Sequence, residues 1–370
     1  MAWDMDAKPR LVFWETTRAC DLACRHCRAS AIATALPGEL NHEEGIALVD
    51  SVAEFGRPYP ILILTGGDVL KRRRLWELIT HARSRGIPVA VSPSVTPLLD
   101  EQVIRRFAEV PVAAMSLSLD GAGPRSHDEL RQVPGTWNRT MELLDVAVAA
   151  GIKVQINTTV MGWNLRELPE LFELIRSRGA HIWEVFFLIH QGRGTEMGAP
   201  TPQECESVCR FLVEAAGYGL VVRTVEAPFF RRVVSQKADG SLPEEDALTR
   251  ELVADLRRRL GAPTELPRHH SSHTRDGRGI VFVDYKGDVS PSGFLPVVTG
   301  NVRTSTLAQI YQEHPLFREL RRAASFGGRC GVCTYRELCG GSRARAFSFT
   351  GDSLAEDPAC AYQPVTAATI

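Results

Sequence analysis

The sequence predicts an α/β fold in which a partial (β/α)6 barrel is followed by a small cysteine-rich C-terminal domain. Two observations lead to this prediction. Short apolar runs alternate with helix-like stretches along the first half of the chain, and seven of the nine cysteines gather in two clusters. Strands that are each separated by a helix imply right-handed crossovers and a parallel sheet. Such a sheet can curl into a full or partial barrel, whose chemistry lies at the C-terminal ends of the strands.

The expected strands are short and rich in Val, Ile, Leu and Phe, as buried parallel strands are. They are Leu11–Thr16, Ile61–Thr65, Ile87–Ser92, Val112–Leu119, Ile152–Val160 and Ile182–Ile189. Helices are expected between them, near residues 42–56, 72–85, 99–109, 136–150 and 165–179. Three of these helices end at a glycine that suits a C-cap, namely Gly86, Gly151 and Gly179.

The pattern divides the chain into three parts. Residues 1–200 form the barrel. Residues 201–278 form a connecting region with helices at 201–217 and 244–260 and no strand between them. Residues 279–370 begin with a β-hairpin and continue as a cysteine-rich segment with short helices near 305–325.

Composition excludes several function classes. The chain has 370 residues and a formal net charge of -1, which gives no bulk electrostatic attraction to nucleic acid or to an anionic membrane. No apolar stretch approaches the roughly 20 residues needed to span a bilayer, and the first ten residues, MAWDMDAKPR, lack an apolar signal core. We therefore expect a cytoplasmic protein, in which clustered cysteines serve metal binding or catalysis.

The first cysteine cluster directly follows the first expected strand. Cys20, Cys24 and Cys27 stand in CDLACRHC, with the spacing Cys-x3-Cys-x2-Cys. Three thiolates on one short loop can bind three irons of a cubane cluster and leave the fourth iron open, as a catalytic cluster requires. The alternative is a zinc site with His26 as the fourth ligand.

This motif at this position resembles that of the radical S-adenosylmethionine (radical SAM) superfamily. The resemblance implies a 4Fe-4S cluster whose open iron chelates S-adenosylmethionine. It also implies reductive cleavage of that cofactor to a 5′-deoxyadenosyl radical, which abstracts hydrogen from a substrate. An electron donor such as flavodoxin or ferredoxin is the expected redox partner.

The resemblance extends to polar residues at the ends of later strands. The segments TGGD, SLSLDG, SHDELR and NTTV resemble the parts of the family that contact the cofactor. Taken singly, each residue could simply cap a turn or a helix. By resemblance, the S-adenosylmethionine contacts are Gly66, Gly67, Asp68, Ser118, Arg131 and Asn157.

The second cluster comprises Cys330, Cys333 and Cys339 in CGVCTYRELC, followed by Cys360. Four thiolates can close a tetrahedral zinc site or bind an iron–sulfur cluster. The region resembles the SPASM domain in its reduced, twitch form. The cysteines of a second auxiliary cluster are replaced by the serine-containing stretches SPSG and GGS. The resemblance therefore implies one auxiliary 4Fe-4S cluster, and two clusters in all.

Other candidate residues have weaker motifs. Cys205 and Cys209 lie four residues apart on an expected helix, and we interpret them as buried, inert thiols. Candidates for substrate contact are His190, Gln191 and Arg193 after the sixth strand. Before the C-terminal domain, a proton donor or the ligands of a substrate metal could come from His269, His270 and His273. A polar loop is the simpler interpretation of the three histidines.

Only the resemblance to known families limits the range of candidate substrates. The stretches GFLP, CGVC-x-YRELCGG and RARA resemble those of family members that modify tetrapyrrole side chains in haem-related pathways. This favours a tetrapyrrole or another small molecule. The first alternative is a maturase that modifies a ribosomally made peptide with the help of a separate carrier protein. The second is a non-catalytic scaffold that binds zinc.

Overall fold

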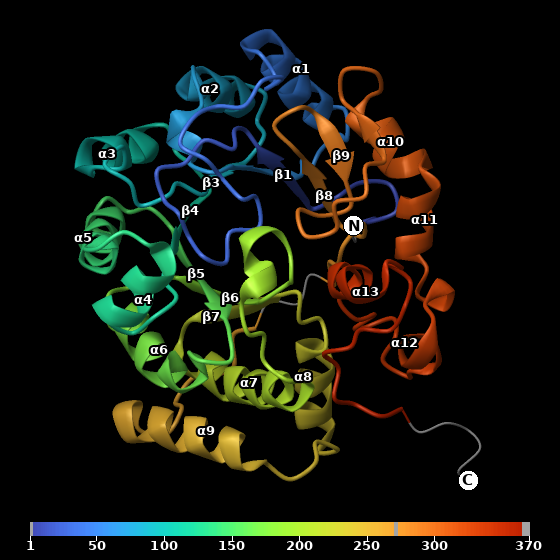
Figure 1. Ribbon diagram of the computed structural model, residues 1–370. Helices are drawn as coiled ribbons and strands as arrows, with labels where there is room; N and C mark the ends of the chain where they lie inside the picture. Colours follow the sequence, from blue (N-terminus) through green and yellow to red (C-terminus); the bar gives the residue numbers. More distant parts are fainter. Residues whose placement is uncertain (1–2, 270–272, 365–370) are drawn as a thin grey trace.

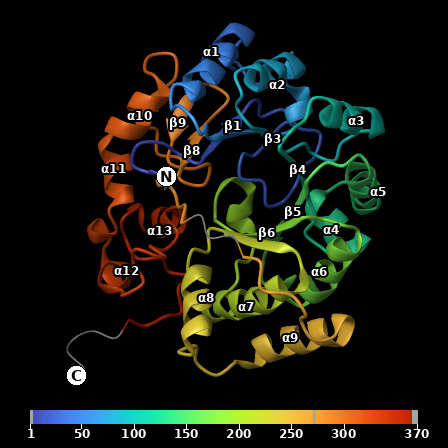
Figure 2. The same ribbon diagram turned by 180° about the vertical axis from the view of Figure 1, so that it is seen from behind.

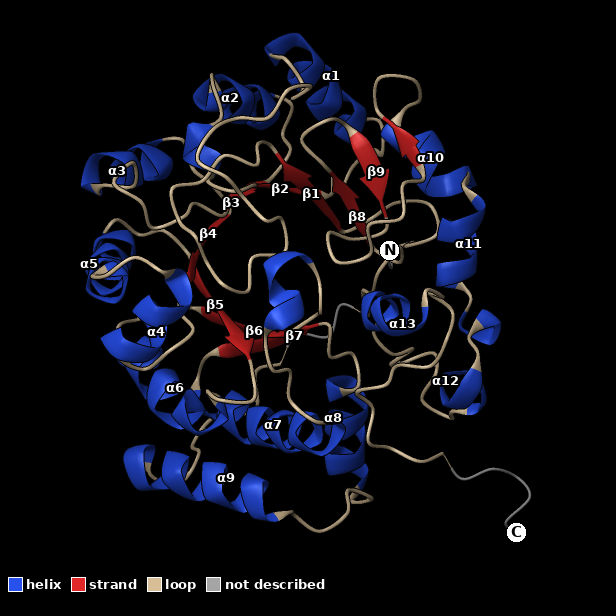
Figure 3. Ribbon diagram, in the orientation of Figure 1, coloured by secondary structure: helices blue, strands red, loops and turns tan. Residues whose placement is uncertain are grey.

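The computed structural model describes residues 3–269 and 273–364. A ten-stranded sheet runs through the molecule in the order β10-β9-β8-β1-β2-β3-β4-β5-β6-β7. The sheet is curved, and the helices α1 to α6 follow its outer side, as Figures 1 and 2 show from opposite directions. Figure 3 shows the strands as an open arc with loops across its inner side. The fold is therefore an open barrel, as the sequence predicts.

All six expected strands form, and β1 to β8 are parallel in the sheet. The expected strands are β1 (Leu11–Glu15), β2 (Ile61–Thr65), β3 (Val89–Val91), β4 (Ala114–Ser118), β5 (Val154–Val160) and β6 (Ile182–Phe187). Their register places Glu15 opposite Thr65, and Ser118 opposite Asn157. The carboxyl ends of the strands, with the expected site residues, thus meet at one edge of the sheet.

Helices cover the outer side of the sheet. They are α1 (His42–Ala53), α2 (Leu75–Ser84), α3 (Glu101–Glu109), α4 (Pro124–Arg131), α5 (Thr136–Ala149) and α6 (Leu168–Ser177). The three expected C-cap glycines have φ between 76° and 80°, a left-handed conformation that glycine adopts without a steric penalty. The short helix α4 was not expected from the sequence.

The connecting region contains a strand, which corrects the prediction that it is purely helical. Strand β7 (Val221–Val225) pairs in parallel with β6. Around it lie α7 (Pro202–Ala215), α8 (Phe230–Asp239) and α9 (Ala247–Leu260). Four of the five residues of β7 are only partly buried, and one of these is Arg223. This weak apolar pattern explains why the sequence did not indicate a strand.

The C-terminal segment continues the same sheet. Strand β8 (Ile280–Val283) pairs in parallel with β1, and β9 (Asp288–Ser290) and β10 (Gly300–Asn301) follow in antiparallel order. The helices beyond them are α10 (Leu307–Glu313), α11 (Pro315–Arg321), α12 (Gly328–Val332) and α13 (Arg343–Thr350). Among residues 3–269 and 273–364, none of the helices has the length and apolar character that a membrane crossing requires.

Candidate functional site

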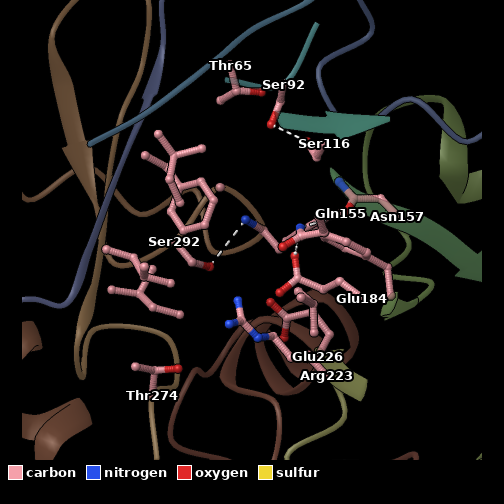
Figure 4. Close-up of a pocket in the computed structure, with 18 of the residues that line it drawn as sticks. Thr65, Ser92, Ser116, Gln155, Asn157, Glu184, Arg223, Glu226, Thr274 and Ser292 are labelled. Atoms are coloured by element: carbon pink, nitrogen blue, oxygen red, sulfur yellow. Dashed lines mark hydrogen bonds between the residues drawn. The ribbon is translucent and has the colours of Figure 1, made fainter. Parts of the chain in front are cut away.

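A cavity of about 850 Å³ lies against the inner face of the sheet. Alternate residues of the strands line it, for example Phe13 and Ile63 on β1 and β2, and Gln155 and Asn157 on β5. This alternation follows from the two-residue period of a strand. Figure 4 shows polar side chains from β2 to β7 pointing into this space. The volume is within the range of pockets that hold cofactors and small molecules.

The three-cysteine loop forms part of the cavity wall. Cys20, Cys24 and Cys27 all line the cavity. The thiol of Cys20 accepts the backbone N–H of Leu22 at 3.4 Å, and Arg131 donates to the sulfur of Cys24 at 3.6 Å. Hydrogen bonds and positive charge at the sulfurs stabilise thiolates, the form that binds metal. The structure therefore brings the three expected ligands together on one side of the cavity.

Gly66 and Gly67 allow the end of β2 to lie directly against the cysteine loop. An added Cβ would lie 2.5 Å from the carbonyl oxygen of Thr17 at position 66, and 2.5 Å from that of Ala19 at position 67. Both positions line the cavity. The two glycines are thus required for the close backbone approach, and they leave polar backbone groups beside the cysteines.

Asp68 directly follows the two glycines but does not line the cavity. Its side chain is fully buried and is not part of the cavity wall. The carboxylate accepts hydrogen bonds from the hydroxyl of Thr96 at 2.7 Å and from the backbone N–H of Leu70 at 3.1 Å. These contacts hold the carboxylate beside the cavity wall, and its contact with the amine of S-adenosylmethionine stays a prediction. Asp68 instead fixes the backbone that follows the two glycines.

Ser118, Arg131 and Asn157 all line the cavity, as expected. Arg131 forms a buried ion pair with Asp120 and also contacts Cys24. Burial alone would raise the pKa of Asp120, but Arg131, His26, His127 and the backbone N–H of Thr159 together outweigh it and lower the pKa to about 2. The pair holds the Arg131 guanidinium beside the cysteine loop at the end of β4.

Beside the predicted Asn157 lie three polar residues of the cavity, Gln155, Glu184 and Arg223, that the sequence analysis did not single out. Gln155 donates hydrogen bonds to Asn157 at 2.8 Å and to Glu184 at 2.7 Å. Burial raises the pKa of Glu184, and the charge of nearby Arg223 opposes this shift. Figure 4 shows these side chains converging from β5, β6 and β7. The sequence contains a pattern that could have identified them, because each is a polar residue at an inward position of its strand.

The remaining candidates differ in position. Arg193 lines the cavity and donates to the carbonyl oxygens of Cys24 and Ala31, so it fastens the cysteine loop. His269 and His273 also line the cavity, whereas His190 and Gln191 do not. His270 lies outside the described residues.

Cys205 and Cys209 are buried in the main hydrophobic core on α7. Burial raises the pKa of Cys205 to about 12. A thiol in such surroundings stays protonated at neutral pH, which is consistent with the interpretation as an inert core residue.

The four C-terminal cysteines gather around a second, smaller pocket. Cys330, Cys333, Cys339 and Cys360 all line it. Backbone N–H groups of Asp357, Tyr335 and Gly341 each point at one of the sulfurs at 3.4 Å. Arg343, whose side chain is fully buried, donates to the sulfur of Cys330 at 3.5 Å. These donors offset negative charge on sulfur, as in iron–sulfur sites.

Burial raises the pKa of Cys339 to about 12 and that of Cys360 to about 11. Such thiols give up their protons when a metal binds to the sulfurs. In the described part of the chain, no three His, Cys, Asp or Glu side chains stand close enough to hold a single metal ion. The four thiols instead surround a small space, and their chemistry and N–H donors fit a cubane cluster.

The comparisons with known proteins agree with this geometry. The family model described as the radical SAM superfamily matches residues 14–175. The chain is also 35% identical over 365 residues to the AdoMet-dependent heme synthase of Oleidesulfovibrio alaskensis, covering 96% of this chain and 88% of that enzyme. The chain belongs to the radical SAM superfamily. It is therefore an enzyme of the class that uses a 4Fe-4S cluster and S-adenosylmethionine, and the alternative of a zinc-binding scaffold is set aside.

Other radical SAM relatives cover nearly the whole chain. An AdoMet-dependent heme synthase of Methanosarcina barkeri is 35% identical over 361 residues, covering 97% of this chain and 98% of that enzyme. The pre-heme d1 synthase of Dinoroseobacter shibae is 29% identical, covering 95% and 85%. Among solved structures, Streptococcus suis SuiB bound to S-adenosylmethionine has a TM-score of 0.69 at 14% identity, covering 96% of this chain and 78% of that one. The latter likeness confirms the predicted fold.

Proposed function

We propose that this radical SAM enzyme modifies a side chain of a tetrapyrrole in a haem-related pathway. The observation that carries the proposal is the cavity, which combines aromatic walls with arginines. Phe13, Phe282 and Phe294 line it beside Arg223 and Arg231. A flat apolar macrocycle with carboxylate side chains requires this combination of surfaces. Relatives named as heme synthases and as a Fe-coproporphyrin III synthase support the same substrate class.

Arg231 is the clearest candidate for a carboxylate contact. It lines the cavity, and its side chain donates to the backbone carbonyls of Leu338 and Thr274. Burial lowers its pKa to about 10, so the guanidinium is still charged at neutral pH. A buried positive charge held by neutral carbonyls favours an anionic ligand nearby.

The cofactor sites follow from the residues on each wall. Cys20, Cys24 and Cys27 would hold the catalytic 4Fe-4S cluster. S-adenosylmethionine would lie against Gly66, Gly67, Ser118, Arg131 and Asn157. When bound and reduced, this pair supplies the 5′-deoxyadenosyl radical that removes a hydrogen atom from the substrate. Arg131 and Arg193 orient the cysteine loop through Cys24.

The second site supports a further part of the proposal. Cys330, Cys333, Cys339 and Cys360 would hold one auxiliary 4Fe-4S cluster, and a flavodoxin or ferredoxin would supply electrons. Both cysteine sites belong to one chain, so electrons would pass from one site to the other without a second protein.

The test is an anaerobic assay of the reconstituted enzyme. Two cubane clusters correspond to about eight irons per chain. With dithionite and S-adenosylmethionine we expect 5′-deoxyadenosine, and with a panel of iron tetrapyrroles that includes Fe-coproporphyrin III we expect a change in substrate mass. Formation of 5′-deoxyadenosine with every tetrapyrrole left unchanged would contradict the proposal. A ribosomally made peptide with its carrier protein would then be the next substrate to try.

A further inference from the structure

A partly buried and a buried carboxyl group, those of Glu226 and Asp276, meet at the cavity wall, and neither belongs to the expected site. Glu226 directly follows β7, and Asp276 precedes β8. Both line the cavity, and their side chains are in hydrogen-bonding contact with each other. Two carboxylates cannot both stay ionised at this distance in a buried site, so one proton must lie between them.

The surroundings indicate which carboxyl holds the proton. Asp276 accepts the backbone N–H of Ala344 at 3.0 Å, at the N-terminal end of α13, where a negative charge is favoured. Glu226 accepts a hydrogen bond from the hydroxyl of Ser342. Burial, and after it the charge of Asp276, raises the pKa of Glu226 well above its ordinary range, although Arg345 opposes the shift. Glu226 is thus the partner that holds the proton, and the oxygen of Asp276 accepts it.

The backbone also holds Glu226 in an unusual conformation. Its φ is 59°, in the left-handed region that residues other than glycine rarely adopt. Residues held in such conformations concentrate at functional sites. Here the glutamate at the end of β7 contacts Asp276 and Ser342, and Figure 4 shows it beside Arg223 in the cavity.

The carboxyl pair lies beside the four-cysteine site. Ser342 follows Gly341, whose N–H points at the sulfur of Cys339 at 3.4 Å. Gly341 lines both the large cavity and the smaller pocket, so it is part of a wall that the two spaces share. A proton that reaches the carboxyl pair and an electron that reaches the four-cysteine site would therefore leave the cavity on the same side.

We propose that Glu226 and Asp276 share one proton at rest and accept a second proton from the substrate during the reaction. The inference rests on the proposed function. After a hydrogen atom has been removed, the substrate radical loses one electron and one proton, and a new double bond forms. The proton is the one on the carbon beside the radical centre, whose C–H bond breaks as the double bond forms. The electron goes to a one-electron iron–sulfur acceptor, for which the four cysteines provide the ligands, and the proton goes to Asp276.

Two variants test the proposal by turnover. Glu226→Gln and Asp276→Asn keep the shape of each side chain but remove the shared proton. Asp145→Asn, in an exposed ion pair with Arg178 on the outer side of the sheet, controls for handling. We expect 5′-deoxyadenosine within about twofold of the unaltered enzyme, and product lowered about 100-fold, as for loss of a general base. The substrate radical should accumulate in electron paramagnetic resonance spectra. Full product formation in both variants would overturn the proposal.

A second measurement needs no substrate and so separates this proposal from the proposed function. Infrared spectra of the reconstituted enzyme should contain the carbonyl band of a protonated carboxylic acid at neutral pH. Glu226→Gln should lose a component of this band that Glu184→Gln keeps, Glu184 being the matched control at another carboxyl of the cavity. A Glu226→Gln spectrum with no loss of intensity in this band would refute the shared proton, even if the enzyme acts on tetrapyrroles. The expected band together with no tetrapyrrole turnover would refute the proposed function alone.

Discussion

The two cysteine sites of this radical SAM enzyme differ in what surrounds their sulfurs. Cys20, Cys24 and Cys27 come from one loop and face a cavity of about 850 Å³. The four C-terminal thiols come from two segments and surround a small pocket with backbone N–H donors on several sides. The first site, with three cysteines and open space beside them, can therefore admit a cofactor. The second site, with four cysteines around a small pocket, is closed.

The supports of the two sites also differ. The first site rests on the ends of parallel strands, where Asp68, Asp120 and His127 are buried behind the cysteine loop. The second rests on short segments around α12 and α13, where Arg343 and backbone N–H groups contact the sulfurs. The residues that support the first site are distant from one another in sequence, whereas those that support the second are close together in the chain.

The largest effect is expected from Cys24→Ala. With two thiolates left on the loop, the first cluster loses its third ligand, so cleavage of S-adenosylmethionine should fall to background. About half of the iron should remain, because the second site is intact. Iron content and 5′-deoxyadenosine, measured anaerobically, check both parts. Unchanged cleavage in this variant would mean that the three-cysteine loop is not the catalytic site.

Cys333→Ala should have the opposite pattern. We expect 5′-deoxyadenosine to form while substrate conversion fails, since the loss affects only the proposed auxiliary cluster. The ratio of 5′-deoxyadenosine to product should rise at least about tenfold, the size of change expected when one cluster no longer takes part in electron transfer. Loss of iron from both sites would instead show that the C-terminal site is needed for folding.

Asp68 tests whether the first site depends on structural support or on direct contact. Asp68→Ala leaves the Thr96 hydroxyl and the Leu70 N–H without their acceptor. We expect it to lower the free energy of unfolding by about 3 kcal/mol. Asp68→Asn keeps an acceptor oxygen and should bind S-adenosylmethionine as the unaltered enzyme does. A weaker affinity of Asp68→Asn for S-adenosylmethionine, with unchanged stability, would support the direct contact between Asp68 and the cofactor that the sequence suggested.

Asp68 also shows how far the sequence could predict the site. The strand-and-cysteine pattern placed six strands and the three-thiol loop, because periodicity and spacing are local properties. The partner of Asp68 is Thr96, 28 residues away, and no local pattern indicates that contact. Strand β7 was missed for a related reason: its inward residues include Arg223, which faces the cavity and breaks the apolar run.

The carboxyl pair was beyond prediction from sequence. Glu226 and Asp276 are 50 residues apart and meet only because β7 and β8 end beside the same cavity. The inward polar residues Gln155 and Glu184, by contrast, could have been found by their alternation along β5 and β6. Sequence periodicity thus finds which residues of a strand face inward, whereas contacts between distant strand ends depend on how the sheet curves.

The smallest effect concerns pH and the support of the first site. His127 is fully buried, and its Nδ1 accepts the backbone N–H of Asp120, which requires a neutral ring. Burial lowers its pKa from 6.5 to about 4. The unfolded chain therefore binds a proton below pH 6.5 that the folded chain refuses, and stability falls as the pH decreases from 6.5 toward 4. Each such histidine contributes a loss of about 1 kcal/mol per pH unit in this window.

His127→Gln should remove this contribution. A pH-dependent loss of similar size should remain in this variant, because burial also lowers the pKa of His26 to about 4. Urea denaturation of the reconstituted enzyme at pH 6.5 and pH 5.5 should therefore show a pH-dependent loss that is smaller by about 1 kcal/mol in the variant. An equal loss in both proteins would mean that His127 is protonated in the folded state. In that case the ring could not accept the Asp120 N–H, and the support behind the cysteine loop would have to be arranged differently.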